Sequence, residues 1–80
     1  MKINFYERAM LRELLEQSEN GIIARSYYQI ANEIGGITYA SVRNYVLTFV
    51  SYGIVAIQYK GTSRQVIHIN TKLANKMLNE

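Results

Sequence analysis

Apolar side chains recur every three or four residues in the first part of the chain, a spacing typical of an amphipathic helix. Asn4 and Glu7 have the spacing of a capping box, in which each side chain accepts from the other residue's amide. The sequence therefore predicts a helix from Asn4 to about Ser18. Asn20-Gly21 ends this helix, and the apolar residues 22–24 predict one brief strand.

Two further helices are expected next, separated only by a short turn. Ser26 and Gln29 form a second capping box, and Gly35-Gly36 ends the helix that this box begins. Thr38 is the expected N-cap of the following helix, which runs to about Tyr52.

The apolar pattern then changes to one that is typical of strands. Residues 54–59 and 66–69 are rich in β-branched and aromatic side chains, and the polar loop 60–64 between them contains a glycine. This pattern predicts a β-hairpin. Thr71 is expected to cap a last helix over about residues 71–79. The chain is therefore expected to be a single α+β domain over residues 1–80.

Composition narrows the possible functions. The 80 residues include no cysteine, which excludes disulfides and cysteine-based zinc sites, and the single His68 lies in a strand pattern without nearby carboxylates. His68 is accordingly interpreted as a half-exposed strand residue. No window approaches the length of a membrane span, and the N-terminus lacks the apolar run of a signal peptide. We expect a soluble cytoplasmic protein without membrane contact, metal, cofactor or small-molecule ligand.

Charge is distributed unevenly along the chain. Residues 1–33 carry four cationic and five acidic side chains, whereas residues 34–79 carry five cationic side chains and no acidic one. A 46-residue stretch without acids favours a polyanionic partner over chance in a mildly basic chain.

Several of these features occur together in one protein family. Ala31 and Gly35 have the spacing of the alanine and glycine at a helix-turn-helix, where two helices cross closely and the turn needs positive φ. The segment 49–55 has an apolar residue, a spacer, a glycine and two aliphatic residues, as at the end of a recognition helix. With the hairpin that follows, the chain resembles the winged helix-turn-helix family of DNA-binding proteins.

The resemblance implies a three-helix core with a β-hairpin wing and an added C-terminal helix. It assigns the helix-turn-helix to about residues 26–52 and the wing hairpin to about residues 54–69. The small size, the lack of cysteine and the richness in Tyr and Ile are also similar to small regulators from viruses and plasmids of thermophilic archaea.

The helix that begins after Thr38 is then the expected recognition helix. Projected at 100° per residue, its Val42, Tyr45, Val46 and Phe49 form a buried stripe, and the opposite face is small and uncharged apart from Arg43. Arginine can donate to guanine and asparagine to adenine in the major groove, and apolar atoms can meet a thymine methyl group. A solvated helix face, the alternative, usually carries more Lys and Glu. The predicted DNA contacts on this helix are Tyr39, Ala40, Ser41, Arg43, Asn44, Leu47 and Thr48.

The wing and the start of the second helix supply further predicted contacts. Lys60 and Arg64 frame a loop whose Thr62 and Ser63 suit phosphate oxygens, although a solvated hairpin loop has a similar composition. By analogy with the family, Arg25 and Tyr27 at the start of the second helix face a backbone phosphate.

The sequence therefore predicts sequence-specific binding of double-stranded DNA by a transcription regulator. The alternative is a winged-helix module for protein–protein interaction in a transcription or replication complex. An enzyme is not expected, because the basic half lacks paired carboxylates and the chain lacks a glycine-rich phosphate loop or a supported Ser/His/Asp set.

A homodimer is expected from surplus apolar surface on the terminal helices, since a chain of this size has a small core. In the rival arrangement, the last helix packs back on the first within one chain and leaves a monomer. The predicted interface comprises Tyr6, Met10, Leu73, Ala74, Met77 and Leu78.

Overall fold

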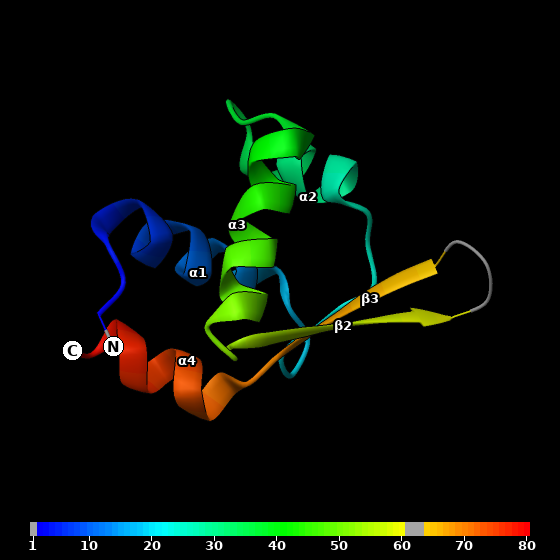
Figure 1. Ribbon diagram of the computed structural model, residues 1–80. Coiled ribbons are helices and arrows are strands. Elements are labelled where there is room, and N and C mark those ends of the chain that lie inside the picture. Colours follow the sequence, from blue (N-terminus) through cyan, green and yellow to red (C-terminus); the bar gives the residue numbers. More distant parts are fainter. Residues whose placement is uncertain (1, 61–63) are drawn as a thin grey trace.

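The computed structural model describes residues 2–60 and 64–80. Over these residues the chain is α+β, with four helices and a three-stranded antiparallel sheet (Figure 1). The elements are α1 (Phe5–Gln17), β1 (Ile22–Ile23), α2 (Tyr27–Ile34), α3 (Tyr39–Ser51), β2 (Val55–Lys60), β3 (Arg64–Ile69) and α4 (Thr71–Leu78). Within the described ranges, no helix combines the length and the apolar character that crossing a bilayer requires.

Side-chain caps fix where the first three helices begin. Asn4 Oδ1 accepts from the Glu7 amide at 2.8 Å, and Glu7 Oε1 accepts from the Asn4 amide at 2.9 Å. Ser26 and Gln29 repeat this reciprocal arrangement at the start of α2. Thr38 Oγ1 accepts from the Ser41 amide at the start of α3. These caps satisfy amides that have no partner inside the helix, and all three predicted helix starts are confirmed.

The turn between α2 and α3 consists of backbone that favours glycine. Gly35 and Gly36 have φ angles of 79° and 68°, a region that residues with a Cβ rarely adopt. Ala31, one turn before, is buried in the core between the two helices. The turn and the small side chain therefore let α3 follow α2 at once and cross it closely.

The sheet has the strand order β1-β3-β2. The predicted hairpin is confirmed: β2 pairs with β3 along its whole length, from Val55 opposite Ile69 to Lys60 opposite Arg64. β1 adds only two residues on the other side of β3, with Ile23 opposite Ile67. The far end of the hairpin thus extends beyond the rest of the sheet (Figure 1).

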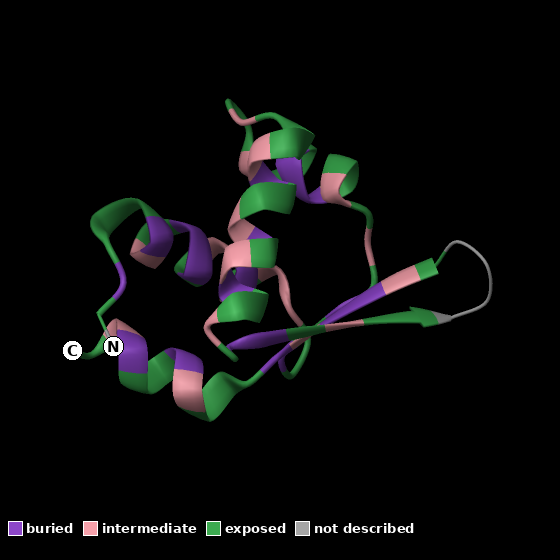
Figure 2. Ribbon diagram, in the orientation of Figure 1, coloured by how far each residue is buried: buried purple, intermediate pink, exposed green. Residues whose placement is uncertain are grey.

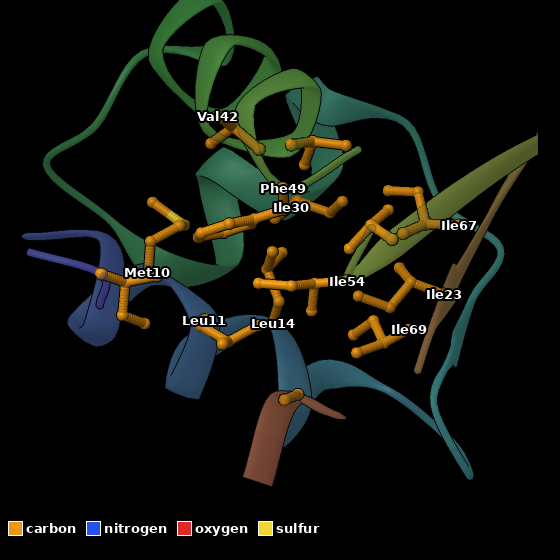
Figure 3. Close-up of a cluster of buried hydrophobic side chains, with 14 of the residues drawn as sticks. Met10, Leu11, Leu14, Ile23, Ile30, Val42, Phe49, Ile54, Ile67 and Ile69 are labelled. Atoms are coloured by element: carbon orange, nitrogen blue, oxygen red, sulfur yellow. The ribbon is translucent and has the colours of Figure 1, made fainter. Parts of the chain in front are cut away.

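The core lies between α1, α3 and the inner face of the sheet (Figure 3). Val42, Val46 and Phe49 of α3 are fully buried, as the projected stripe predicted, and Tyr45 is half-buried beside them. Complete burial of such side chains stabilises the fold by roughly 1.5–3 kcal/mol each. Burial of this stripe fixes which face of α3 points outward.

The last helix packs against α1 of the same chain. Ala74 and Met77 are buried, and Arg8 of α1 donates through Nη1 to the backbone oxygens of Met77 and Leu78 at 3.2 and 2.6 Å. The N-cap of α4 is Asn70, whose side chain accepts from the Leu73 amide, so the predicted cap at Thr71 was wrong by one residue.

This packing corrects the predicted dimer interface. Met10, Ala74 and Met77 lie in the core of one chain, in which α4 packs against α1. Leu73 and Leu78 are half-buried against the same core. Buried side chains are not free to join two folded subunits. Of the six predicted interface residues, Tyr6 is the one that stays largely exposed.

Candidate nucleic-acid interface

The outward face of α3 is small and carries one charge. Ala40, Arg43, Asn44 and Leu47 are all exposed, and the helical projection directs them away from the buried stripe. Figure 2 shows exposed segments repeating along α3. Val42 behind them is fully buried and holds the helix in this rotation. A face of this kind allows the helix backbone to approach a groove closely, with one guanidinium and one amide available for hydrogen bonds.

Arg43 lies on the flank of α3 that faces α2 and the hairpin. Burial of the Tyr27 ring raises the pKa of its hydroxyl above the ordinary value, because the phenolate loses solvation. Tyr59 of β2 acts in the same direction, whereas the positive charge of Arg43 opposes it. The three side chains are therefore close enough to interact electrostatically, and Tyr27 remains a neutral hydrogen-bond donor at neutral pH.

The opposite flank of α3 faces the first turn of α1. Ser41, Asn44 and Thr48 line a small hollow there together with Asn4 and Glu7. The Thr48 hydroxyl donates to the Asn44 backbone oxygen at 2.9 Å, which is a local bond within the helix. The Glu7 side chain, although only 8% exposed, places a carboxylate in the lining of this hollow, so the hollow is less suited to a phosphate than the rest of the α3 face.

A second concave surface lies between the start of α2 and the hairpin. This groove, of about 670 Å³, is lined by Arg25 and Tyr27 on one side and by Tyr59 and Arg64 on the other. Tyr59 is 69% exposed, and Arg64 is also exposed. Two guanidinium groups and two phenol groups provide donors on both walls, a combination that suits phosphate oxygens.

Arg25 also has a structural contact that the sequence did not indicate. Its Nη2 donates to the backbone oxygen of Gln17 at 2.9 Å, at the end of α1. Part of the guanidinium therefore satisfies a helix C-terminal carbonyl. Only the guanidinium donors that this bond leaves free can make the predicted phosphate contact of Arg25.

The remaining predicted contacts divide into those that the structure locates and those that it does not. Tyr39 is exposed at the first position of α3, on the side toward α2 in the helical projection. Lys60 ends β2 opposite Arg64. Thr62 and Ser63 lie outside the described residues.

Tyr59 was not among the predicted DNA contacts, because the sequence does not show which residues lie beside it until the register of the hairpin is known. Its place opposite Gln65, near the free end of the hairpin, turns it toward the groove. Residues two apart share one face of a sheet, so Tyr59 lies on the same face as Ile57, which packs against the core.

Comparison with protein-family models and with curated protein sequences found no match to this chain. Its function is therefore inferred from its own residues and their geometry.

Proposed function

We propose that this chain is a winged helix-turn-helix protein that binds double-stranded DNA sequence-specifically and regulates transcription. In this proposal α2, the glycine turn and α3 are the helix-turn-helix, and the β2–β3 hairpin is the wing. The four helices and three antiparallel strands occur in an order that is compatible with that fold.

The outward face of α3 is the observation that carries the proposal. A recognition helix must bring its backbone near the base edges, so long side chains with acidic ends would keep it out. Ala40 leaves room for this approach, while Arg43 and Asn44 have the donors that read guanine and adenine. Residues 34–79, which include α3 and the hairpin, contain no acidic side chain that would repel phosphates.

The groove beside α3 supports the same orientation. With α3 in the major groove of the duplex, the sugar–phosphate backbone would pass the protein groove whose two walls carry Tyr27 and Tyr59. Hydroxyl and guanidinium donors position a protein on the duplex without reading its sequence. Arg64 would add a contact from the wing to the backbone or to a narrow minor groove.

A titration with duplex DNA at two salt concentrations tests the proposal. Binding should weaken steeply as salt rises, because each phosphate contact releases condensed counterions. Repeated selection from a random duplex pool should then enrich one sequence motif. A chain that binds no duplex at low salt, or that enriches no motif, would contradict the proposal.

A protein-interaction module is the second candidate, and the apolar atoms on α3 favour it. Leu47 is 41% exposed, and Val50 is exposed on the same side of the helix. Apolar side chains on an exposed helix face can anchor a partner protein as well as a thymine methyl group. If Leu47→Ser left DNA affinity intact at every sequence, these atoms would serve something other than DNA.

A further inference from the structure

The strand β3 has an unpaired edge beyond the point where β1 ends. β1 pairs with β3 only over Ile22–Ile23. The next residues of the chain, 24–26, leave the sheet and lead to α2 (Figure 1). On this side β3 is therefore without a partner strand over its first part, which comprises Arg64, Gln65 and Val66.

Gln65 directs its backbone groups to this unpaired edge. The N–H and C=O groups of successive residues in an antiparallel strand point alternately to its two neighbours. The Ile69 amide donates to the Gly21 oxygen at 2.7 Å, so the odd-numbered residues of β3 face the β1 side. Continued in the same register, the ladder would pair Gln65 with Arg25, but no backbone hydrogen bond joins these two residues in the described chain. Gln65 thus presents one free N–H donor and one free C=O acceptor, side by side.

The unpaired edge forms part of the groove between α2 and the hairpin. Gln65 lines this groove together with Arg25, Tyr27, Tyr59 and Arg64. Its volume of about 670 Å³ lies within the range of roughly 300–1,000 Å³ that is usual for small-molecule sites. The side-chain Nε2 of Gln65 is also buried without a hydrogen-bond partner in the described chain. A buried donor of this kind costs free energy until an acceptor reaches it.

We propose that this groove binds a nucleotide, with its base paired to the free backbone groups of Gln65, its ring stacked beside Tyr59 and its phosphate on Arg64. Unpaired nucleobases carry donors and acceptors side by side on their edges, and proteins read them by such pairing together with stacking on aromatic side chains. A free mononucleotide and an unpaired nucleotide of a nucleic-acid strand share this chemistry. No small-molecule ligand was expected from the sequence, because residues 25–27 and 59–65 come together only in the fold.

Two other kinds of ligand match the groove less well. Phosphate alone offers acceptor oxygens, so it would leave the Gln65 C=O without a donor. An added peptide strand forms a ladder of several pairs, whereas Ile67, the next residue of β3 that faces this side, is already paired with Ile23. A nucleobase needs the single pair that Gln65 offers, and its ring would cover Tyr59, which is 69% exposed.

The nucleotide site does not rest on the proposed function, because its test uses no duplex. If the chain also binds a duplex as proposed, a bound nucleotide and the sugar–phosphate backbone would compete for Arg64. The groove would then couple DNA binding to the concentration of a small ligand.

A titration of the isotope-labelled chain, followed by the shifts of its amide resonances, measures the binding and locates it. Adenosine monophosphate should bind with a dissociation constant of roughly 0.1–1 mM, at least roughly tenfold more tightly than inorganic phosphate. The largest shifts should occur at the backbone and side-chain amides of Gln65. No binding, or binding no tighter than that of phosphate, would overturn the proposal, as would an acidic peptide that binds this edge more tightly than the nucleotide.

A single-stranded trinucleotide with one adenine distinguishes the two sources of the ligand. Tighter binding of the strand than of adenosine monophosphate would assign the groove to an unpaired nucleotide of a nucleic acid. Equal binding would assign it to the free mononucleotide, since the neighbouring nucleotides would then add no contact.

Variants test the placement of the base and of the phosphate. Tyr59→Ala should weaken binding of adenosine monophosphate at least roughly fivefold, because the base loses its stacking partner. Tyr28→Ala removes an exposed ring of α2 that does not line the groove, and it should leave the affinity unchanged. Arg64→Ala should weaken binding of adenosine monophosphate roughly three- to tenfold more than binding of adenosine, which has no phosphate. Equal losses for the two tyrosine variants, or for the two ligands with Arg64→Ala, would contradict the proposal, and the amide spectrum shows that each variant is folded.

Discussion

The Tyr52 hydroxyl donates a hydrogen bond of 2.9 Å to Glu7 Oε2, joining the end of α3 to the first turn of α1. The other oxygen of the same carboxylate closes the α1 capping box through the Asn4 amide. One nearly buried carboxylate therefore fixes the start of α1 and its position against the outward-facing helix. This contact positions α3, which carries the candidate interface, against α1.

Removal of the Tyr52 hydroxyl should destabilise the fold without altering its surface. Tyr52→Phe leaves one Glu7 oxygen without its donor, and we expect a measurable decrease in the free energy of unfolding. Urea unfolding followed by circular dichroism measures this loss. Tyr28→Phe is the matched control, because Tyr28 is exposed on α2 and should change stability by less than about 0.5 kcal/mol. Equal effects of the two variants would contradict the role assigned to Tyr52.

The same hydroxyl predicts a stability change at alkaline pH. The hydrogen bond to Glu7 is the main cause that raises the pKa of Tyr52 above its ordinary value, followed by burial of the ring and the charge of the carboxylate. A raised folded-state pKa means that the folded chain binds this proton more tightly than the unfolded chain. The contribution is therefore complete below the unfolded pKa of about 10 and is lost as pH rises through the folded value. Tyr52→Phe should flatten the decline in unfolding free energy above about pH 10, and an unchanged slope would contradict this assignment.

Arg8 is expected to hold the end of α4 on the core. Arg8→Met keeps much of the aliphatic stem but removes the donors to the Met77 and Leu78 oxygens. Loss of charged hydrogen bonds of this kind costs about 1.5–3 kcal/mol. Amide hydrogen exchange should accelerate in α4 more than in α3, since α4 makes the fewer contacts with the rest of the chain. Lys72→Met, an exposed change on α4, should leave the exchange pattern unaltered.

Arg43 is expected to read sequence. Arg43→Ala should cost about 1–3 kcal/mol at the preferred duplex and leave non-specific binding nearly intact. Fluorescence anisotropy with the selected duplex and a scrambled duplex measures both affinities. Lys76→Ala, an exposed cation on α4, controls for the loss of one positive charge. If both affinities fell together, Arg43 would contact phosphate and not a base.

The two cations that frame the hairpin loop are expected to meet phosphates. Replacement of both Lys60 and Arg64 by alanine should weaken binding to all duplexes alike, and the slope of log affinity against log salt should decrease by up to about 2 units. Titrations at four or five salt concentrations give this slope. An unchanged slope would place the hairpin away from the duplex.

Local signals predicted most of the elements, because caps and turns depend on neighbouring residues. Asn4, Ser26 and Thr38 each begin a helix where the sequence indicated. The start of α4 was displaced by one residue because Asn70 and Thr71 are both good caps, and the end of β3 decides between them.

Long-range contacts could not be predicted in this way. The apolar stripe of α4 showed that the helix has a buried side, but not whether its own α1 or a second copy covers it. The bond between Tyr52 and Glu7 spans 45 residues and leaves no periodic pattern. The bond of Arg25 to the Gln17 oxygen is similar, because its acceptor is a backbone atom that any residue could supply.

Arg8 also reaches beyond α4, since its Nη2 donates to the Glu80 backbone oxygen at 3.4 Å. One guanidinium on α1 thus bonds to three backbone oxygens near the end of α4. The first helix therefore supplies the C-terminal cap of the last one, although 69 residues or more separate the partners along the chain.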